Sequence, residues 1–423
     1  MAMIVSGMTG NEIFCLAQKG LLPGELCVGN SVVSMGLGGA FGAFGSALAG
    51  GEVKQLTELI SEGRHAAITR MEQEAQKFGA TGVTSVVSEL RTLAGYTEFL
   101  AQGTSVHAQQ GAMPFFSTAA SGMQTYCHLD CGYRPVKFVM GNIAYALGVG
   151  RGFMGSFRTM ARGEVHEYSQ MYNEIRHVAL QRIRAEAVHA GANAVVDIGV
   201  KVLPFGAGVE LLMTGTASHH GRLVLPPGVA PPAGGAAVTS ELTGEELWNL
   251  QKLGLVPVSL VMATSVYSLG IAQGIGAMFR AMSKGEIPEV TSLVYHAREN
   301  ALELLKKEAQ ALGAERVVGN KLLIQELSPG LIEVVAIGTA LRREAGMEPA
   351  TPALLPQAII VDRDSLDAPA LSQLPGAQPV ATRPQVRSSR AGCIIGIIYV
   401  VMMFVIGIAV MISKLAAGTG HHH

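Results

Sequence analysis

The chain has 423 residues, of which 49% are apolar and 15% are charged, and its net charge is −1. This balance supplies material for several cores and excludes the basic surface that nucleic-acid binding needs. The first residues, MAMIVSGMTGNEIF, lack the cationic start and compact apolar run of a secretory signal. Five cysteines fit a reducing compartment rather than a disulfide framework: Cys15, Cys27, Cys127, Cys131 and Cys393.

The sequence matches itself at offsets of 112 and then 122 residues. TGNEIFCLAQKGLLP begins at Thr9, SGMQTYCHLDCGYRP at Ser121 and TGEELWNLQKLGLVP at Thr243. The alignment has no gap until the last hairpin of the third copy, where one residue is inserted. We therefore predict three copies of one α+β unit, at 9–110, 117–222 and 240–345, with a Pro/Gly linker at 223–239.

Each copy begins with the pattern of a capping box, in which Ser or Thr is followed three residues later by Glu or Gln. The two side chains satisfy backbone N–H groups at the start of a helix. The three pairs are Thr9/Glu12, Ser121/Gln124 and Thr243/Glu246. A glycine then ends each short helix, at Gly20, Gly132 and Gly254.

A β-branched run such as VKFVM (136–140) follows and predicts the first strand. After a Gly-Glu pair, apolar residues at spacings of three and four predict a helix of about seven turns. We expect the glutamates of these pairs, Glu52, Glu164 and Glu286, at the positive end of the helix dipole. Gly79, Gly191 and Gly313 stop the helix.

Two more strands close each copy, for example at 194–203 and 209–217. Each copy is therefore a β-α-β-β repeat: a small three-stranded sheet covered by one long helix, with a short N-terminal helix.

Residues 26–51 contain no charged side chain, and they are long enough to span a bilayer. The aligned residues of the other copies include Arg151, Arg158 and Arg280, and a charge at a bilayer centre costs several kcal/mol. We therefore expect 26–51 to pack against a neighbouring copy or subunit; contact with lipid is the alternative.

The composition changes after the third copy. Residues 346–390 are rich in proline and fit an extended tether, and 391–413 are apolar and long enough for one transmembrane helix. Three arginines precede this segment and one lysine follows it, which puts the N-terminal bulk in the cytoplasm of a bacterial cell, on its inner membrane. Gly392 and Gly396 form a small-xxx-small pair for helix packing. Residues 414–423 form a tail that ends in a histidine-tag remnant.

The residues Cys127, His128 and Cys131 are the one cluster with metal-binding side chains. Their spacing is not that of a zinc site, and the third copy has Asn249, Leu250 and Leu253 at these positions. We therefore predict neither a metal nor another cofactor, and interpret the cysteines as core residues.

Three polar positions recur in every copy. An arginine lies in the middle of the long helix, one glutamate near its end and another on the last strand. Three equivalent catalytic sites in one chain are improbable, and no nucleotide-binding or hydrolase motif occurs in a suitable context. We therefore predict a non-enzyme in which these residues make structural or interface contacts: Arg64, Arg176, Arg298, Glu74, Glu186, Glu308, Glu98, Glu210 and Glu333.

The copies resemble the YbjQ-like domain family, whose label is "putative heavy-metal-binding". The resemblance is carried by Gly141-Asn142 after a Val-rich strand, by the Gly-Glu-led helix with Ala-Arg-Glu at 297–299, and by Ile-Gly-Thr-Ala at 337–340. It implies a small β-α-β-β fold and assembly into pentameric rings through sheet edges. The ligand set of a metal site does not carry over.

We expect a membrane-tethered homo-oligomer that forms rings or stacked rings and encloses a chamber. If each copy forms its own ring, five chains stack three rings. The alternative is a module that binds a metal or a small ligand at subunit interfaces or in the ring lumen.

Overall fold

The computed structural model describes residues 3–34, 51–93, 96–111, 113–146, 163–205, 208–224, 230–268, 288–328 and 331–354. The chain divides into two compact units, Met1–Gln357 and Ala358–His423, and all described residues lie in the first. Most of the segment 26–51, most of the tether and the candidate membrane helix, with Gly392 and Gly396, lie outside the described ranges.

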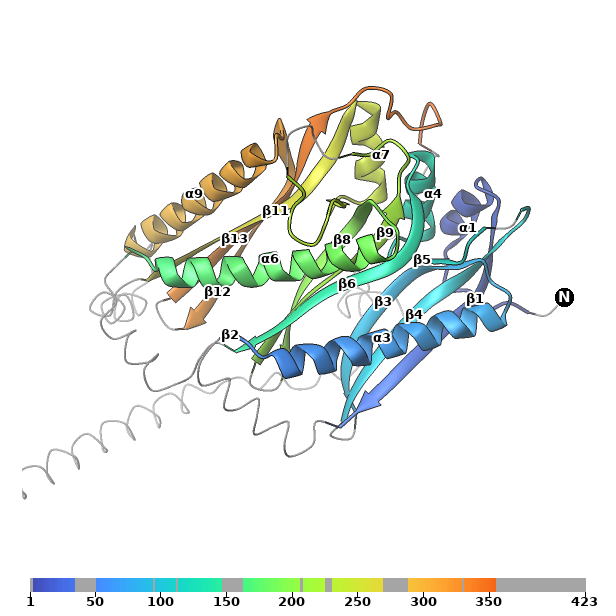
Figure 1. The fold of residues 1–423 in the computed structure, drawn as a ribbon, viewed down its shortest axis with the longest axis horizontal. Coiled ribbons are helices and arrows are strands. Elements are labelled where there is room, and N and C mark those ends of the chain that lie inside the picture. Colours follow the sequence, from blue (N-terminus) through green and yellow to red (C-terminus); the bar gives the residue numbers. More distant parts are fainter. Residues whose placement is uncertain are drawn as a thin grey trace, which may run out of the picture. The chain divides into compact units, whose positions relative to one another are not determined.

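The described residues form three successive α+β repeats with six helices, which confirms the predicted α+β class and the tandem repeats (Figure 1). The first repeat contains α1 (Gly10–Ala17), β1 (Leu21–Val33), α3 (Lys54–Lys77), β3 (Gly82–Leu93) and β4 (Tyr96–Ala108). The second contains α4 (Gly122–Asp130), β6 (Arg134–Ala146), α6 (His166–His189), β8 (Ala194–Phe205) and β9 (Gly208–His219). The third contains α7 (Gly244–Lys252), β11 (Leu255–Ser268), α9 (Pro288–Ala311), β12 (Arg316–Ser328) and β13 (Leu331–Arg343).

The short helices begin at the capping boxes that the sequence indicates. In each of the three, the hydroxyl of the first residue accepts the N–H of the fourth, whose side chain accepts the N–H of the first. Glycines with positive φ follow the short and the long helices, where a side chain would strain the backbone: Gly20, Gly79, Gly132, Gly191, Gly254 and Gly313.

The sheets are larger than the three-stranded prediction. Two-residue strands extend them, so that the orders are β1-β4-β3-β5, β10-β8-β9-β6-β2 and β12-β13-β11-β7. β5 (Phe116–Ser117) and β10 (Val238–Thr239) come from the segments before the second and third repeats and pair in parallel with β3 and β8. The first strands are also longer than predicted, since β6 extends well beyond 136–140 on both sides.

The first two Gly-Glu pairs have a different role from the one predicted, and the third, with Glu286, lies outside the described residues. Glu52 and Glu164 lie in β2 (Gly51–Glu52) and β7 (Gly163–Glu164), which pair with the first strand of the next repeat, β6 and β11. The long helices start one residue later, after Val53 and Val165. Glu52 forms an ion pair of 2.7 Å with Arg182 of the second repeat rather than capping its own helix.

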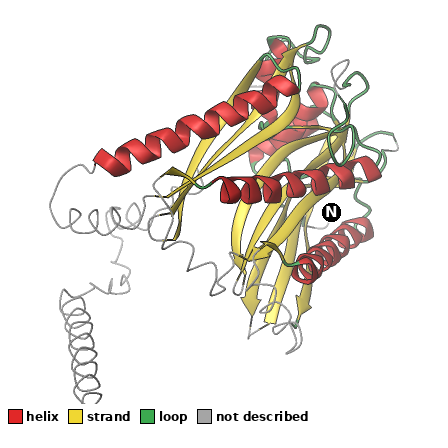
Figure 2. Cartoon of the chain, turned by 60° about the vertical axis from the view of Figure 1, so that its left-hand side comes forward, coloured by secondary structure: helices red, strands yellow, loops and turns green. Residues whose placement is uncertain are grey.

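The long helices and the sheets alternate. The core around α3 includes residues of the first sheet and also Phe138, Met140 and Ala144 of the second. The core around α6 likewise includes residues of the second sheet and Leu260 and Met262 of the third. The core around α9 contains residues of the third sheet alone. Figures 1 and 2 show the three long helices, each lying across strands. Two helices are thus covered by two sheets, and the third by one.

Helix α6 lies so close to β6 that a side chain does not fit between them. A Cβ atom at Gly141 would collide with the carbonyl oxygen of Ala179 and the amide nitrogen of Ile183. Because both obstacles are backbone atoms, they cannot move aside cheaply. Gly29 has the same relation to α3 in the first repeat.

We therefore expect Gly141→Ala to lower the free energy of unfolding by about 1–3 kcal/mol, because it overpacks this contact. Chemical denaturation followed by circular dichroism measures the change. Gly221→Ala is the matched control, since no atom lies within 4 Å of a Cβ at that position. Equal stabilities of the two variants would contradict the close approach.

Candidate functional site: the junctions between repeats

The recurring polar residues lie mainly where one repeat meets the next. We use "junction" for the contact between the long helix of one repeat and the sheet of the following repeat. The first junction joins α3 to the sheet that contains β6 and β9, and the second joins α6 to the sheet that contains β11 and β13.

Each junction begins with two hydrogen bonds at the start of the helix, one between backbone groups and one from a backbone N–H to a hydroxyl. Val53 N–H donates to the carbonyl of Ala144 at 2.8 Å, and Ala144 N–H donates to the Thr57 hydroxyl at 2.9 Å. The second junction has the same two bonds, at 2.8 and 2.9 Å, among Val165, Val266 and Ser169. The helix start therefore extends the edge of the next sheet in both junctions.

A buried ion pair lies at the centre of the first junction. Arg64 donates from Nε to Oε1 of Glu210 at 3.1 Å and from Nη2 to Oε2 at 2.7 Å, and both side chains are 0% exposed. Its Nη1 donates to the Ser88 hydroxyl at 3.0 Å, and the guanidinium lies 5.7 Å from the centre of the Phe99 ring. A two-pronged contact of this kind fixes the orientation of both partners.

The second junction brings the aligned residues together as an ion pair, but through one close contact rather than two hydrogen bonds. Nη1 of Arg176 lies 2.7 Å from Oε1 of Glu333, and the two side chains are 5% and 0% exposed. The same nitrogen donates to the Thr264 hydroxyl at 2.8 Å and to the carbonyl of Tyr172 at 3.2 Å. In both junctions an arginine of one repeat is thus neutralised by a glutamate of the next.

A histidine–glutamate pair adds to each junction near the surface. Nε2 of His65 lies 3.2 Å from Glu186, and Nε2 of His177 lies 3.1 Å from Glu308. Hydrogen bonding to these carboxylates raises the pKa of both histidines, although burial acts in the opposite direction. Each glutamate also accepts a backbone N–H from its own sheet, at Met140 and Met262.

The remaining members of the recurring set lie at the two ends of the array. Arg298 on α9 is exposed and forms no ion pair with a described residue, whereas Arg64 and Arg176 are buried. Glu98 on β4 is half-buried and accepts one hydrogen bond, 3.4 Å long, from Asn30. Glu74 is half-buried and accepts the N–H of Val28 at 2.5 Å.

Asp130 is a contact shared by all three repeats, which the repeat pattern did not reveal. Its carboxylate accepts bonds from Lys19 at 2.6 Å, from Trp248 at 2.7 Å and from the Thr351 hydroxyl at 2.6 Å. Burial raises the pKa of Asp130, but these bonds outweigh it and hold the pKa below its ordinary value. Only the second repeat has an aspartate at this position, so no recurrence marked it.

The cysteine–histidine cluster lies inside the protein. Cys127, His128 and Cys131 are all buried, and burial raises the pKa of both thiols. Burial lowers the pKa of His128 to about 4 and raises that of Asp197, whose carboxyl group lies 3.4 Å from the imidazole. Among the residues that the structure describes, no three His, Cys, Asp or Glu side chains are grouped as metal ligands.

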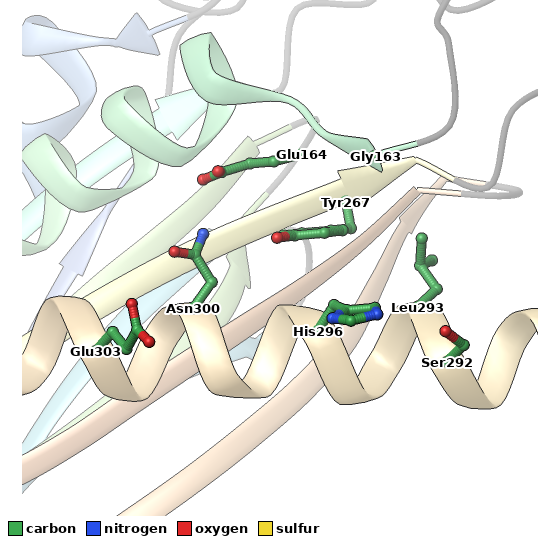
Figure 3. A pocket seen from close by; sticks show the side chains of 8 residues that line it. All are labelled: Gly163, Glu164, Tyr267, Ser292, Leu293, His296, Asn300 and Glu303. Carbon is green, nitrogen blue, oxygen red and sulfur yellow. The ribbon is translucent and has the colours of Figure 1, made fainter.

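An open groove of about 640 Å³ lies beside the second junction (Figure 3). It is lined by Glu164 of β7, Tyr267 of β11 and polar side chains of α9 that include His296 and Glu303. At the aligned place in the first junction, Arg182 of α6 forms an ion pair with Glu52. Helix α9 has Leu304 at the position of Arg182, and Glu164 therefore forms no ion pair with a described residue. The groove is open, and none of the described polar side chains that line it is fully buried, as an anchor for a specific ligand would be.

The family model described as "Putative heavy-metal-binding", YbjQ_1, matches residues 23–109, 133–220 and 254–344. The chain belongs to this family. The three matches coincide with the three repeats from their first strand to their last. The description names a metal, but the described part of the chain offers no grouped ligands that would explain it.

Several relatives are similar to parts of the chain. The encapsulin nanocompartment protein Rv1762c of Mycobacterium tuberculosis is 31% identical over 232 residues, which are 53% of this chain and 84% of the relative. A UPF0145 protein of Thermosipho africanus is 44% identical over 82 residues, 19% of this chain and 76% of its own length. A UPF0145 protein of Methanocella arvoryzae is 39% identical over 90 residues, 20% of this chain and 75% of its own length. The two shorter matches are about one repeat in length.

We expect Glu210→Gln to lower the free energy of unfolding by about 3–5 kcal/mol, because it leaves the Arg64 charge buried without a carboxylate. Urea denaturation measures this. The control is Glu98→Gln, at the aligned but half-buried position, which we expect to change stability by less than about 0.5 kcal/mol. Adding Arg64→Met to Glu210→Leu removes both charges and should recover most of the loss. A variant Glu210→Gln as stable as its control would refute a buried ion pair.

The histidine–glutamate pairs predict a pH dependence. Because the folded protein raises the pKa of His65 and His177, their contribution is complete below the unfolded pKa of about 6.5 and is lost as the pH rises through the folded pKa. The double variant His65→Gln/His177→Gln should therefore lose more thermal stability, relative to the parent, at about pH 6 than at about pH 8.5. His219→Gln, at an exposed position, is the control. A pH-independent difference would show that the imidazoles stay neutral.

Proposed function

We propose that the chain is a homo-oligomeric scaffold, tethered through residues 391–413 to the cytoplasmic face of a bacterial inner membrane. The observation that carries the oligomer is the contrast in burial between aligned positions. Arg64 and Phe138 are buried where the first repeat meets the second. The aligned residues, Arg298 on the last long helix and Leu26 on the first sheet, are exposed. An apolar and charged surface of this type marks an interaction site.

The similarity to an encapsulin nanocompartment protein supports a scaffold that encloses a chamber. The tether and membrane helix rest on the sequence; within the described ranges, no helix is both long and apolar enough to cross a bilayer. A module that binds a metal or small ligand remains the alternative, and the open groove at Glu164 is the one described feature that favours it.

The arrangement of rings needs revision from the sequence-based prediction. Three stacked pentameric rings require each repeat of a chain to lie in its own ring, with free faces toward the repeats of other chains. In the structure, the repeats of one chain occupy these faces themselves. We therefore propose a scaffold in which each chain supplies three consecutive positions of one array.

Light scattering of the detergent-solubilised full chain tests the scaffold. We expect particles with the mass of two or more chains, after subtraction of the detergent, and electron micrographs in which repeats form continuous rings or rows. Particles with the mass of one chain at all concentrations would refute the proposal. Metal analysis of the same sample decides the alternative, which a stoichiometric metal would favour.

A further inference from the structure

We propose that copies of this chain join head to tail, with α9 of one copy packed against the first sheet of the next copy as α3 and α6 pack within the chain. This rests on the proposed scaffold and specifies its interface. Two surfaces meet in it. The helix face consists of Thr291, Val294, Arg298, Leu302 and Lys306; the sheet face consists of Leu26, Val28, Val32 and Glu98.

The helix face consists of the residues of α9 that align with the buried second side of α3 and α6. Thr291 is exposed, whereas its counterparts Thr57 and Ser169 are both 5% exposed and bind the next sheet. Val294 and Leu302 are half-buried, but the corresponding residues of α3 and α6 are at most 3% exposed: Ile60, Tyr172, Ile68 and Leu180. The opposite side of α9 is buried against its own sheet in the usual way. One side of this helix thus lacks the sheet that its counterparts have.

The sheet face shows the complementary exposure. Leu26, Val28 and Val32 are 45%, 42% and 50% exposed. Their counterparts in the second repeat, Phe138, Met140 and Ala144, are 1%, 4% and 0% exposed because α3 covers them. In the third repeat the corresponding residues are covered by α6 and are 0% exposed: Leu260, Met262 and Val266. An apolar stripe that is covered twice within the chain is therefore open at its first occurrence.

The charges match across the two faces. Each internal junction pairs an arginine of the helix with a glutamate of the next sheet, Arg64 with Glu210 and Arg176 with Glu333. Arg298 and Glu98 are the residues aligned with these arginines and glutamates, and a third junction of the same kind would pair Arg298 of one copy with Glu98 of a second copy. Within one copy neither residue forms an ion pair with a described residue, so both are available.

The segment before α1 carries an independent signal. Residues 4–6 align with β5 and β10, the short strands that pair with the preceding repeat. The Ser6 hydroxyl accepts the N–H of Met8 at 3.3 Å; Thr118 accepts Ala120 at 3.1 Å and Ser240 accepts Leu242 at 3.1 Å in the same way. The segment therefore shares a local hydrogen bond with β5 and β10, but among the described residues no strand pairs with it as β3 pairs with β5; Ile4 and Val5 are 53% and 64% exposed.

The third sheet has the matching edge: within the described ranges no strand pairs with the outer side of β12, where the carbonyl of Val317 accepts one long bond, 3.5 Å, from the Asn320 side chain. In the first sheet, Phe116 N–H donates to Thr81 O at 3.2 Å and Thr118 N–H donates to Val83 O at 2.9 Å. The carbonyls aligned with these acceptors belong to Glu315 and Val317 at the start of β12, which is the edge strand of its sheet. An unpaired edge is a template for a strand from another chain. Ile4 N–H and Ser6 N–H of a second copy are the donors that fit.

One pair differs at the joint between copies. Glu299 of α9 stands where His65 and His177 stand in the internal helices, and it faces the position of Glu74 of the next copy. The attraction between an imidazolium and a carboxylate in the internal junctions is thus replaced by repulsion between two carboxylates. Two other charged groups would lie near Glu299 and Glu74 in this joint. One is Lys306 on the same helix face, and the other is Glu25, which aligns with Lys137. We therefore expect the joint between copies to be weaker than the internal junctions.

The test is a charge exchange in the full chain, followed by sedimentation velocity in detergent. Arg298→Glu and Glu98→Arg should each raise the dissociation constant at least about thirtyfold, because each places like charges in a desolvated contact. The variant with both substitutions restores opposite charges between copies and should regain most of the affinity. Both residues are exposed or half-buried within one copy, so the circular dichroism spectrum of each variant should match that of the parent and serves as the folding control.

Two further variants test the strand and the mismatched pair. Ile4→Pro removes a ladder donor and should weaken association, whereas Met3→Pro, at a residue 87% exposed and outside the ladder, should not. Glu299→His recreates the internal pair and should strengthen association about fivefold at a pH near 6.

The outcomes separate this inference from the proposed function. A particle of several chains that is insensitive to all these substitutions would overturn the head-to-tail joint and leave the scaffold intact; the chain's own segment 355–423 covering β12 would give this result. A single-chain particle for the unsubstituted protein would overturn both. Loss of assembly in both single variants without recovery in the exchanged variant would also refute the pairing of Arg298 with Glu98.

Discussion

The long helices α3 and α6 each have buried residues on two opposite sides, and a single sheet can cover only one of them. The core around α3 therefore takes in side chains from the first and second sheets, and the core around α6 takes in side chains from the second and third. Burying the second side of a helix removes several large apolar side chains from water, at about 25 cal/mol per Å². The repeats consequently depend on their neighbours, as in other tandem arrays in which each unit contacts the next.

The buried Arg–Glu pairs fit a role in alignment better than a role in raising stability. Removing two charges from water costs several kcal/mol per ion, and their attraction often only offsets that cost. A shift of the helix along the next sheet would leave Arg64 or Glu210 buried without a partner, whereas an apolar contact would tolerate such a slip. Because both junctions place the pair at aligned positions, they also keep the same register.

The repeats, capping boxes and helix-ending glycines were predictable because each depends on residues a few positions apart. The partners of the recurring charges were not, since recurrence shows that Arg64 is equivalent to Arg176 but not which glutamate of which repeat it meets. The short strands β2 and β7 were also missed, because two residues carry too little pattern and their partners lie in another repeat. Asp130 binds residues from three distant segments, and no local spacing could indicate that convergence.

Covalent linkage makes the junctions within one chain different from a joint between chains. The peptide chain holds the internal partners at a high effective concentration, so these junctions form without loss of the translational freedom of a second molecule. A joint between copies bears that loss and, with Glu299 opposite Glu74, also lacks the histidine pair. In the proposed head-to-tail assembly, two contacts are therefore held within each chain and the third depends on the concentration of chains. In that assembly, the strength of the joint depends on the positions of the first and third repeats at which the sequence departs from the second, such as Glu299.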